Sequence, residues 1–352
     1  MSRSTGTDAT DKWTFARGVA LAATLGGVVL LVWAVIGARD ILLITLSAVL
    51  FAVLLDGGVR GVRTALWLPR WFVLLSLWLL LAAVLTGGAW LLAPRAAADL
   101  DLLAERMPAA MEEIDHALQD TEVGRELVEQ LADVWDSSTL EDTARRFLGV
   151  FSSVVGATSA VLVVLVLGMF IASEPDTYVG GAIRLLPPAA RQRGAEVASE
   201  LGHALRWWLV GRFLSMLVVF IVTWVGLYVM DVPLTFLLAF IAGLFSFVPT
   251  FGPVASAVPA VLVGLSAGLE QALWVGLLYL GIQMVESYGI TPFIERRAVR
   301  VPPALLVVFQ LVMGVFAGVL GVLLATPILV VLMVLVGMLY VEDRLGEQAT
   351  LP

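Results

Sequence analysis

Residues 232–264 read VPLTFLLAFIAGLFSFVPTFGPVASAVPAVLVG, and residues 301–332 read VPPALLVVFQLVMGVFAGVLGVLLATPILVVL. Both stretches begin with Val-Pro. At a constant offset of 69 residues they share a phenylalanine and a glycine, and each has a proline a few residues beyond that glycine. These residues are Phe240, Gly252 and Pro259 in the first stretch and Phe309, Gly321 and Pro327 in the second. Because proline and glycine interrupt helices, we interpret the two stretches as degenerate copies of one broken apolar helix.

The composition indicates a membrane protein. Of the 352 residues, 60% are hydrophobic and 14% are charged, whereas an ordinary soluble domain has about 25% charged residues. The mean hydropathy is +0.97. A soluble core could not bury so much apolar surface, so we predict a polytopic protein with several membrane-spanning helices.

The residue inventory argues against an enzyme. The chain has no cysteine and only two histidines, His116 and His203, which lie far apart in polar segments. Its sequence contains no nucleophile–base set, no cluster of metal ligands and no glycine-rich phosphate loop. We therefore expect no catalytic residues, no metal site, no cofactor and no nucleic-acid partner.

Six segments have the length and apolarity of membrane spans, for which about 20 residues suffice. They are residues 18–38, 41–59, 71–93, 148–172, 207–230 and 271–290. In the two broken stretches each limb has only about 15–17 residues, which is short of a full span. We therefore predict an all-α polytopic fold with about six full spans and two re-entrant helical hairpins. Two tilted spans in place of each hairpin would give the same topology.

The placement of arginine predicts the orientation in the membrane. Short loops rich in arginine favour the cytoplasmic side. If successive spans cross the membrane in alternating directions, four basic segments fall on one side. They are the N-terminal tail and the segments after residues 59, 172 and 290. We assign that side, with both termini, to the cytoplasm of a bacterial inner membrane.

Residues 94–147 form a hydrophilic segment with 14 acidic residues and 5 arginines, a net charge of −9. Apolar residues from Leu100 to Leu118 recur every three or four positions, which indicates an amphipathic helix. The predicted topology places this segment outside the cytoplasm. It is either an external helical collar that contacts other subunits or an amphipathic linker that packs on its own chain.

The topology makes the two broken stretches an inverted repeat. Residues 207–268 combine a span that leaves the cytoplasm with a hairpin that enters from outside, and residues 271–340 combine a returning span with a hairpin that enters from inside. Inverted repeats with interrupted helices near the bilayer midplane are typical of secondary transporters. The predicted organisation is a membrane region at 1–93, the acidic segment at 94–147, a fourth span with a cytoplasmic linker at 148–206, a transport core at 207–341 and a cytoplasmic tail at 342–352.

The tip of the first hairpin carries the strongest local signal, Pro249-Thr250-Phe251-Gly252-Pro253, flanked by Ser246 and Ser256. A proline has no N–H to donate and displaces the carbonyl four residues earlier. Pro249 should therefore free the carbonyl of Phe245, and Pro253 should free that of Pro249. Unpaired carbonyls at membrane depth would line a wet cavity, where they could bind a cation or a polyhydroxylated solute. A structural kink without a ligand is the alternative.

The second hairpin has small residues near its predicted tip, at Gly314, Gly318 and Gly321. Pro327 follows them and should free the carbonyl of Leu323. Gly314 and Gly318 also fit a small-residue pattern for helix packing, which is the alternative.

Polar residues inside the spans complete the predicted pathway. Tyr279, Gln283 and Glu286 share one face of the sixth span, and a carboxylate within a span should face protein or water. Arg212 enters the fifth span at a similar depth, so it can pair with Glu286, either as a static salt bridge or as a moving part of a mechanism. The predicted substrate pathway comprises Ser246, Pro249, Thr250, Gly252, Pro253, Ser256, Gln283, Glu286, Gln310, Gly318, Gly321 and Pro327.

Several of these motifs resemble the autoinducer-2 exporter family of bacterial permeases. The run from Phe247 to Pro253 resembles the Pro-x-x-Gly-Pro hairpin of that family. The resemblance covers about residues 200–340 and continues through Gln283-Met-Val-Glu286, Thr291-Pro292, Gly318-Val-Leu-Gly321 and Thr326-Pro327. Two positions depart from the family pattern, and both bear on substrate choice. Ser287-Tyr288-Gly289 stands where an asparagine usually follows the glutamate, and Pro302-Pro303 stands where a His-Pro is common.

The resemblance implies an inner-membrane transporter that forms a homo-oligomer, in a family linked to export of a furanone-type quorum signal and to sodium/proton antiport. We accordingly predict alternating-access transport of a small polar solute, with export of a signal or metabolite like autoinducer-2 as the first choice. A cation/proton antiporter is the first alternative, because Glu286 would suit it equally. A membrane scaffold that transports nothing and recruits partners through residues 94–147 is the second.

Overall fold

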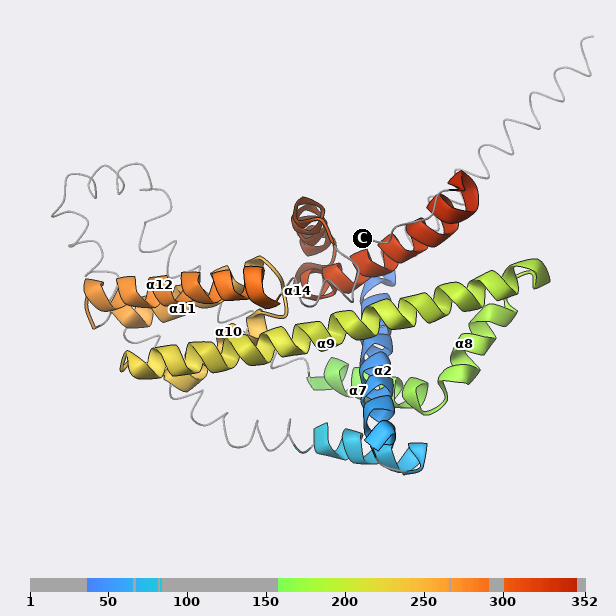
Figure 1. Ribbon diagram of the computed structural model, residues 1–352, viewed down its shortest axis with the longest axis horizontal. Helices are drawn as coiled ribbons and strands as arrows, with labels where there is room; N and C mark the ends of the chain where they lie inside the picture. Colours follow the sequence, from blue (N-terminus) through green and yellow to red (C-terminus); the bar gives the residue numbers. More distant parts are fainter. Residues whose placement is uncertain are drawn as a thin grey trace, which may run out of the picture.

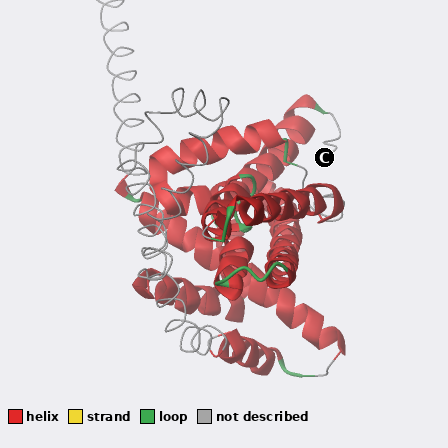
Figure 2. Ribbon diagram, turned by 90° about the vertical axis from the view of Figure 1, so that its left-hand side faces the viewer, coloured by secondary structure: helices red, strands yellow, loops and turns green. Residues whose placement is uncertain are grey.

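The computed structural model describes residues 37–65, 68–81, 83, 158–265, 267–290 and 301–346. Figure 2 shows these residues as helices joined by short loops, with no strand among them. The helices in Figure 1 are α2 (Arg39–Ala65), α7 (Thr158–Ser173), α8 (Pro175–Arg184), α9 (Arg191–Val229), α10 (Thr235–Phe245), α11 (Phe251–Leu265), α12 (Leu269–Val285) and α14 (Pro303–Val336). A further apolar helix covers Arg70–Leu81, and shorter helical turns cover Pro188–Ala190, Glu286–Ile290 and Gly337–Leu345. Most of the first predicted span and all of the acidic segment at 94–147 lie outside the described residues.

The 39-residue helix α9 organises the described part of the fold. Its N-terminal part is polar up to Arg206, and its apolar part begins at Trp207. The predicted boundary between the cytoplasmic linker and the fifth span, at residue 207, falls inside this one helix, and its position relative to a membrane stays a prediction. The two parts are continuous because no proline interrupts the chain between Pro188 and Pro233. α9 packs against α2, α10, α12 and α14, and Figure 1 shows α2 crossing it steeply beside α7.

Three helices in the described ranges have the length and apolarity to cross a membrane: Arg39–Arg63, Pro188–Val229 and Pro303–Leu345. A fourth span would result if Ala160–Ser173 and Pro175–Arg184, which meet at 81°, crossed together. Their bend falls at Glu174, because the residue before a proline disfavours the helical conformation. The structure thus confirms a helical membrane protein, whereas the count of six spans stays a prediction.

The first broken stretch forms α10 and α11, which are joined by a turn at residues 246–250. Thr250 in that turn has a left-handed backbone with a φ of 72°, an uncommon conformation for a β-branched residue. A Cβ on Gly252 would collide with the carbonyl oxygen of Phe245, so the turn requires glycine at this position. The helix therefore breaks where the glycine and proline pattern predicted.

The second broken stretch, α14, is assigned as one helix but is kinked at Gly318. The backbone angles of Gly318 (φ 60°, ψ −143°) are accessible to glycine and costly for other residues. A Cβ on Gly321 would collide with the carbonyl oxygen of Met313, eight residues earlier, which is possible only if the chain turns tightly between them. Figure 1 shows this sharp change of direction within α14.

The ends of the first broken stretch lie close together. The amide of Gln271, at the start of α12, donates a hydrogen bond to the carbonyl of Met230, directly after α9. This contact fits the first predicted hairpin. The inverted relation between the two stretches and their re-entry into a membrane stay predictions.

Two hydrophobic clusters meet along α9. The first joins the N-terminal part of α9 with α2 and α14, around Leu205 and Val330. The second joins its C-terminal part with α10, α11 and α12, around Leu227 and Val275. The stretch of α9 between them, residues 210–218, carries the polar site described next.

Candidate functional site

A buried charge pair links α9 to the end of α12. Arg212 Nη1 lies 3.6 Å from Glu286 Oε1, and the two side chains are only 11% and 8% exposed. Arg212 Nε also donates a hydrogen bond of 2.9 Å to the carbonyl of Phe247 in the turn between α10 and α11. The predicted pairing of Arg212 with Glu286 is therefore present, and the same arginine holds the tip of the first broken stretch.

Two serines also contact the Glu286 carboxylate. Ser215 Oγ donates to Glu286 Oε1 at 2.6 Å, and Ser246 Oγ donates to the same oxygen at 3.4 Å. The two hydroxyl oxygens lie 3.5 Å apart. A buried carboxylate requires a counter-charge and hydrogen-bond donors, and here α9 and the tip of the first stretch supply both.

Glu286 opens a π-helical turn, Glu286–Ile290, that follows α12. The sixth span was predicted as one helix to residue 290, and the change of helix type at Glu286 is a finding that periodicity did not suggest. π turns widen a helix locally and occur often at functional sites. We refer to Arg212, Ser215, Ser246 and Glu286 as the Glu286 site.

Gln310 joins the two broken stretches. Its side chain is completely buried, and its Nε2 donates a hydrogen bond of 3.1 Å to the carbonyl of Pro249. The first limb of α14 therefore contacts the turn between α10 and α11. This contact brings two residues of the predicted pathway together over 61 positions of sequence.

The expectation of unpaired carbonyls at the first tip is wrong. The carbonyl of Pro249 accepts from Gln310 and from the backbone N–H of Phe251 at 2.8 Å. The carbonyl of Phe245 accepts from the backbone N–H of Val248 at 2.9 Å. Tight turns and a side chain from α14 have replaced the helical bonds that the prolines remove.

Several buried polar atoms nevertheless lack a hydrogen-bond partner among the described residues. They are Arg212 Nη2, Thr223 Oγ1, Tyr279 Oη, Gln283 Oε1 and Gln310 Oε1. Buried polar atoms in native proteins are nearly always paired with protein or water. These atoms on α9, α12 and α14 include both donors and acceptors that a bound solute or water could pair with.

The other residues of the predicted pathway take different positions. Ser256 is buried, but its hydroxyl donates to the carbonyl of Pro253 in its own helix at 3.0 Å. Thr250 is exposed, and Gln283 Nε2 donates to Ser287 Oγ at 3.1 Å. Gly252, Gly318, Gly321 and Pro327 shape the two broken stretches. Their role in transport stays a prediction.

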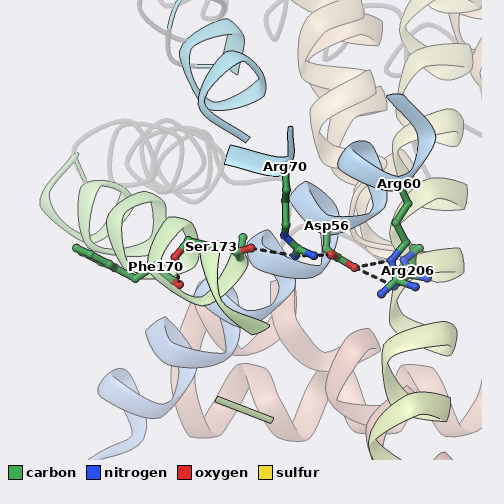
Figure 3. Close-up of polar contacts among 7 residues, drawn as sticks. Asp56, Arg60, Arg70, Phe170, Ser173 and Arg206 are labelled. Atoms are coloured by element: carbon green, nitrogen blue, oxygen red, sulfur yellow. Dashed lines mark hydrogen bonds and ion pairs between the residues drawn. The ribbon is translucent and has the colours of Figure 1, made fainter. Parts of the chain in front are cut away.

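A second polar cluster, shown in Figure 3, is centred on Asp56. Its side chain is 11% exposed and lies within a 27-residue helix. Asp56 pairs with Arg60 at 2.8 Å, with Arg70 at 2.8 Å and with Arg206 at 3.3 Å. These four residues are the Asp56 cluster. The spacing of Asp56 and Arg60 by four residues was the only local sign of it.

Two further ion contacts join distant segments. Arg193 pairs with Glu342 at 2.7 Å and with Asp343 at 3.0 Å, so the start of α9 is tied to the end of the described chain. Arg39 Nη1 donates a hydrogen bond of 2.6 Å to the carbonyl of Phe316, next to the kink of α14. No sequence pattern indicated either contact.

Residues 20–340 match the sequence profile of the AI-2E family transporter. Among curated proteins, the chain is similar to "Putative transport protein YrrI" of Bacillus subtilis, with 28% identity over 43% of each chain. It is similar to "Putative transport protein YueF" of the same organism, with 22% identity over 54% of this chain and 53% of that one. It is also similar to "Putative transport protein MT0215" of Mycobacterium tuberculosis, with 33% identity over 48% of this chain and 46% of that one.

The chain spans about half the length of these curated relatives. The family profile, in contrast, extends over nearly the whole chain, including the segments that carry the Glu286 site and both broken stretches. Together with the apolar helices, this match confirms the resemblance read from the hairpin motifs: the chain belongs to the AI-2E transporter family.

Proposed function

We propose that this chain moves a small polar solute across the bacterial inner membrane by alternating access, along a path that passes the Glu286 site. The observation that carries the proposal is a buried ion pair whose partners also hold the tip of a broken helix. A charged pair within a membrane span is costly and is usually retained for a functional reason. On our proposal, that reason is passage of the solute.

The hydrogen bonds that Gln310 and Arg212 make to the first tip are weak enough to exchange. Gln310 joins the broken stretches through one hydrogen bond, and such a bond contributes about 1 kcal/mol net. Arg212 binds the carbonyl of Phe247 through a second hydrogen bond. A solute with several hydroxyl groups could replace both bonds as it enters, so opening the tip would not leave buried polar groups unpaired.

The character of the solute follows from the balance of charge and hydrogen bonding. Arg212 and Glu286 neutralise one another, so the site has no net charge for a strongly ionic solute. The buried atoms without partners include both donors and acceptors, which suits a neutral polyhydroxylated compound. Export of a signal or metabolite of the autoinducer-2 type is our first choice, with the homo-oligomer as the working unit.

A cation/proton antiporter is the second candidate, and a separate observation favours it. Glu286 Oε1, Ser215 Oγ and Ser246 Oγ lie within 3.5 Å of one another. Oxygen atoms so placed could ligate a small hard cation, with protonation of Glu286 as the competing event. On this reading Glu286→Gln would lose cation/proton exchange completely.

Flux measurements distinguish these functions. Full-length protein reconstituted in liposomes should move a labelled polyol or furanone down its gradient, and Glu286→Gln should abolish that flux or its dependence on a pH gradient. An untargeted comparison of metabolites inside and outside cells with and without the chain identifies the solute. Sodium-driven proton movement without solute flux would favour the antiporter. No flux of either kind would favour a scaffold and contradict the proposal.

A further inference from the structure

The Asp56 cluster lies outside the proposed pathway, where α2, the Arg70–Leu81 helix, α7 and α9 meet (Figure 3). Three guanidinium groups face a single carboxylate in this cluster. Two positive charges therefore remain uncompensated within it. The side chains of Arg70 and Arg206 are only 34% and 25% exposed. Because water screens them less than fully exposed side chains, the repulsion between the positive charges is stronger.

The cluster also has more hydrogen-bond donors than acceptors. A carboxylate offers about four acceptor positions, whereas each guanidinium offers five N–H groups. One additional acceptor is the carbonyl of Ala172, which lies 3.2 Å from Arg70 Nη2. The buried Nε atoms of Arg70 and Arg206 have no partner among the described residues. An anion with several oxygen atoms would supply the charge and the acceptors that the cluster lacks.

Three helices change from apolar to polar sequence at the level of this cluster. The apolar run of α2 ends at Asp56, that of α7 ends at Ala172, and that of α9 begins after Arg206. From Arg206 to Val229, α9 continues for 23 residues. That length corresponds to about 35 Å of helix, enough to cross a hydrocarbon core of about 30 Å. If this part of α9 crosses the hydrocarbon core, the cluster lies at one membrane–water boundary.

Exposed aromatic side chains flank the cluster. Trp71 and Phe72, directly after Arg70, are 66% and 45% exposed and pack edge to face with their ring centres 5.8 Å apart. Phe170, two residues before Ala172, is 60% exposed. Aromatic residues beside basic ones are typical of the interface between acyl chains and headgroups. Lipid acyl chains can thus cover the apolar neighbours of the three arginines.

We propose that the Asp56 cluster binds the phosphate of an anionic phospholipid headgroup in the leaflet at this boundary. Arginine recognises phosphate oxygens through paired N–H bonds, and basic pockets between membrane helices bind anionic headgroups. Arg60, whose side chain is 65% exposed, presents the accessible face of the site. The lipid would join α2, α7 and α9.

Lipid binding to the full-length protein in detergent tests the proposal. Native mass spectrometry measures the affinity for phosphatidylglycerol, and phosphatidylcholine and inorganic phosphate serve as competitors. Arg60→Gln should weaken phosphatidylglycerol binding about fivefold, which is the usual effect of one basic residue at a membrane surface. Asp56 keeps Arg70 and Arg206 in this variant, so the fold should persist. Arg63→Gln, an exposed arginine one turn further along α2, makes the same charge change outside the cluster and should have less than a twofold effect.

Three results would overturn the proposal. Equal weakening by Arg60→Gln and Arg63→Gln would indicate diffuse attraction to a basic surface. Equal affinity for phosphatidylglycerol and phosphatidylcholine would remove the role of charge. Displacement of phosphatidylglycerol by inorganic phosphate at equal concentration would assign the site to a free anion. Each measurement concerns lipid binding alone, so failure of solute transport would not affect it.

Discussion

Replacing Glu286 by glutamine tests whether the Glu286 site is a buried ion pair. The substitution keeps the shape of the side chain and removes its charge, which leaves Arg212 buried without its counter-charge. Breaking a buried pair in this way costs about 3–5 kcal/mol. Arg212 retains the carbonyl of Phe247, and the new amide oxygen can still accept from Ser215. We therefore expect the free energy of unfolding to fall by about 3 kcal/mol, at the lower end of that range. The Tm of the detergent-solubilised chain should drop by several degrees.

Replacing the other partner, Arg212, by glutamine should lower the free energy of unfolding less. In Arg212→Gln the carboxylate keeps Ser215 and Ser246 as donors and can take up a proton, whereas a guanidinium cannot lose one. Glu270→Gln is the matched control, because Glu270 is exposed in the first turn of α12 and such changes cost about 0.5 kcal/mol or less. If Glu286→Gln lowers the Tm no more than Glu270→Gln does, the pair is hydrated and the argument from burial fails.

Gly252→Leu and Gly321→Leu should insert normally but abolish solute flux in liposomes, because a side chain at either position collides with a backbone carbonyl and forces the tip open. Gln310→Leu should lose the hydrogen bond to Pro249 and lower the free energy of unfolding by about 1 kcal/mol. It should also let the two broken stretches move independently, which would be measured as solute leaking through the protein in liposomes. Topology is tested in the natural cysteine-free background: a membrane-impermeant maleimide should label a cysteine at Asp120, and not one at Arg191, in intact cells.

The glycine substitutions have a matched control. Gly281→Leu adds the same side chain at a position of α12 where a Cβ meets nothing within 4 Å, so its flux should stay near normal. Normal flux in a well-inserted Gly252→Leu or Gly321→Leu protein would reduce these glycines to packing details. A tight, fully coupled Gln310→Leu transporter would mean that its bond is incidental. Labelling at Arg191 but not at Asp120 would reverse the orientation.

Residue pattern alone was enough to predict the local features of the fold. Apolar runs gave the helices, and glycine and proline gave the positions where α10–α11 and α14 are interrupted, because both effects act within a few residues of the chain. The similar depth of Arg212 and Glu286 also followed from counting residues along two antiparallel helices. The combined motifs of residues 200–340 indicated the family, which the match over residues 20–340 confirms.

What the sequence could not determine is which side chain reaches which partner. Gln310 reaches Pro249 across 61 residues, and Arg206 reaches Asp56 across 150 residues. These contacts depend on how α14 and α2 lie against α9, and that arrangement comes from the packing of whole apolar faces rather than from any local pattern. Of the carbonyls expected to be open, that of Pro249 accepts from Gln310 of α14 as well as from a local turn, whereas that of Phe245 accepts from a local turn. Sequence thus determined where the helix breaks, and tertiary packing decided what fills the break, because hydrogen-bond partners in a membrane core are supplied by neighbouring helices.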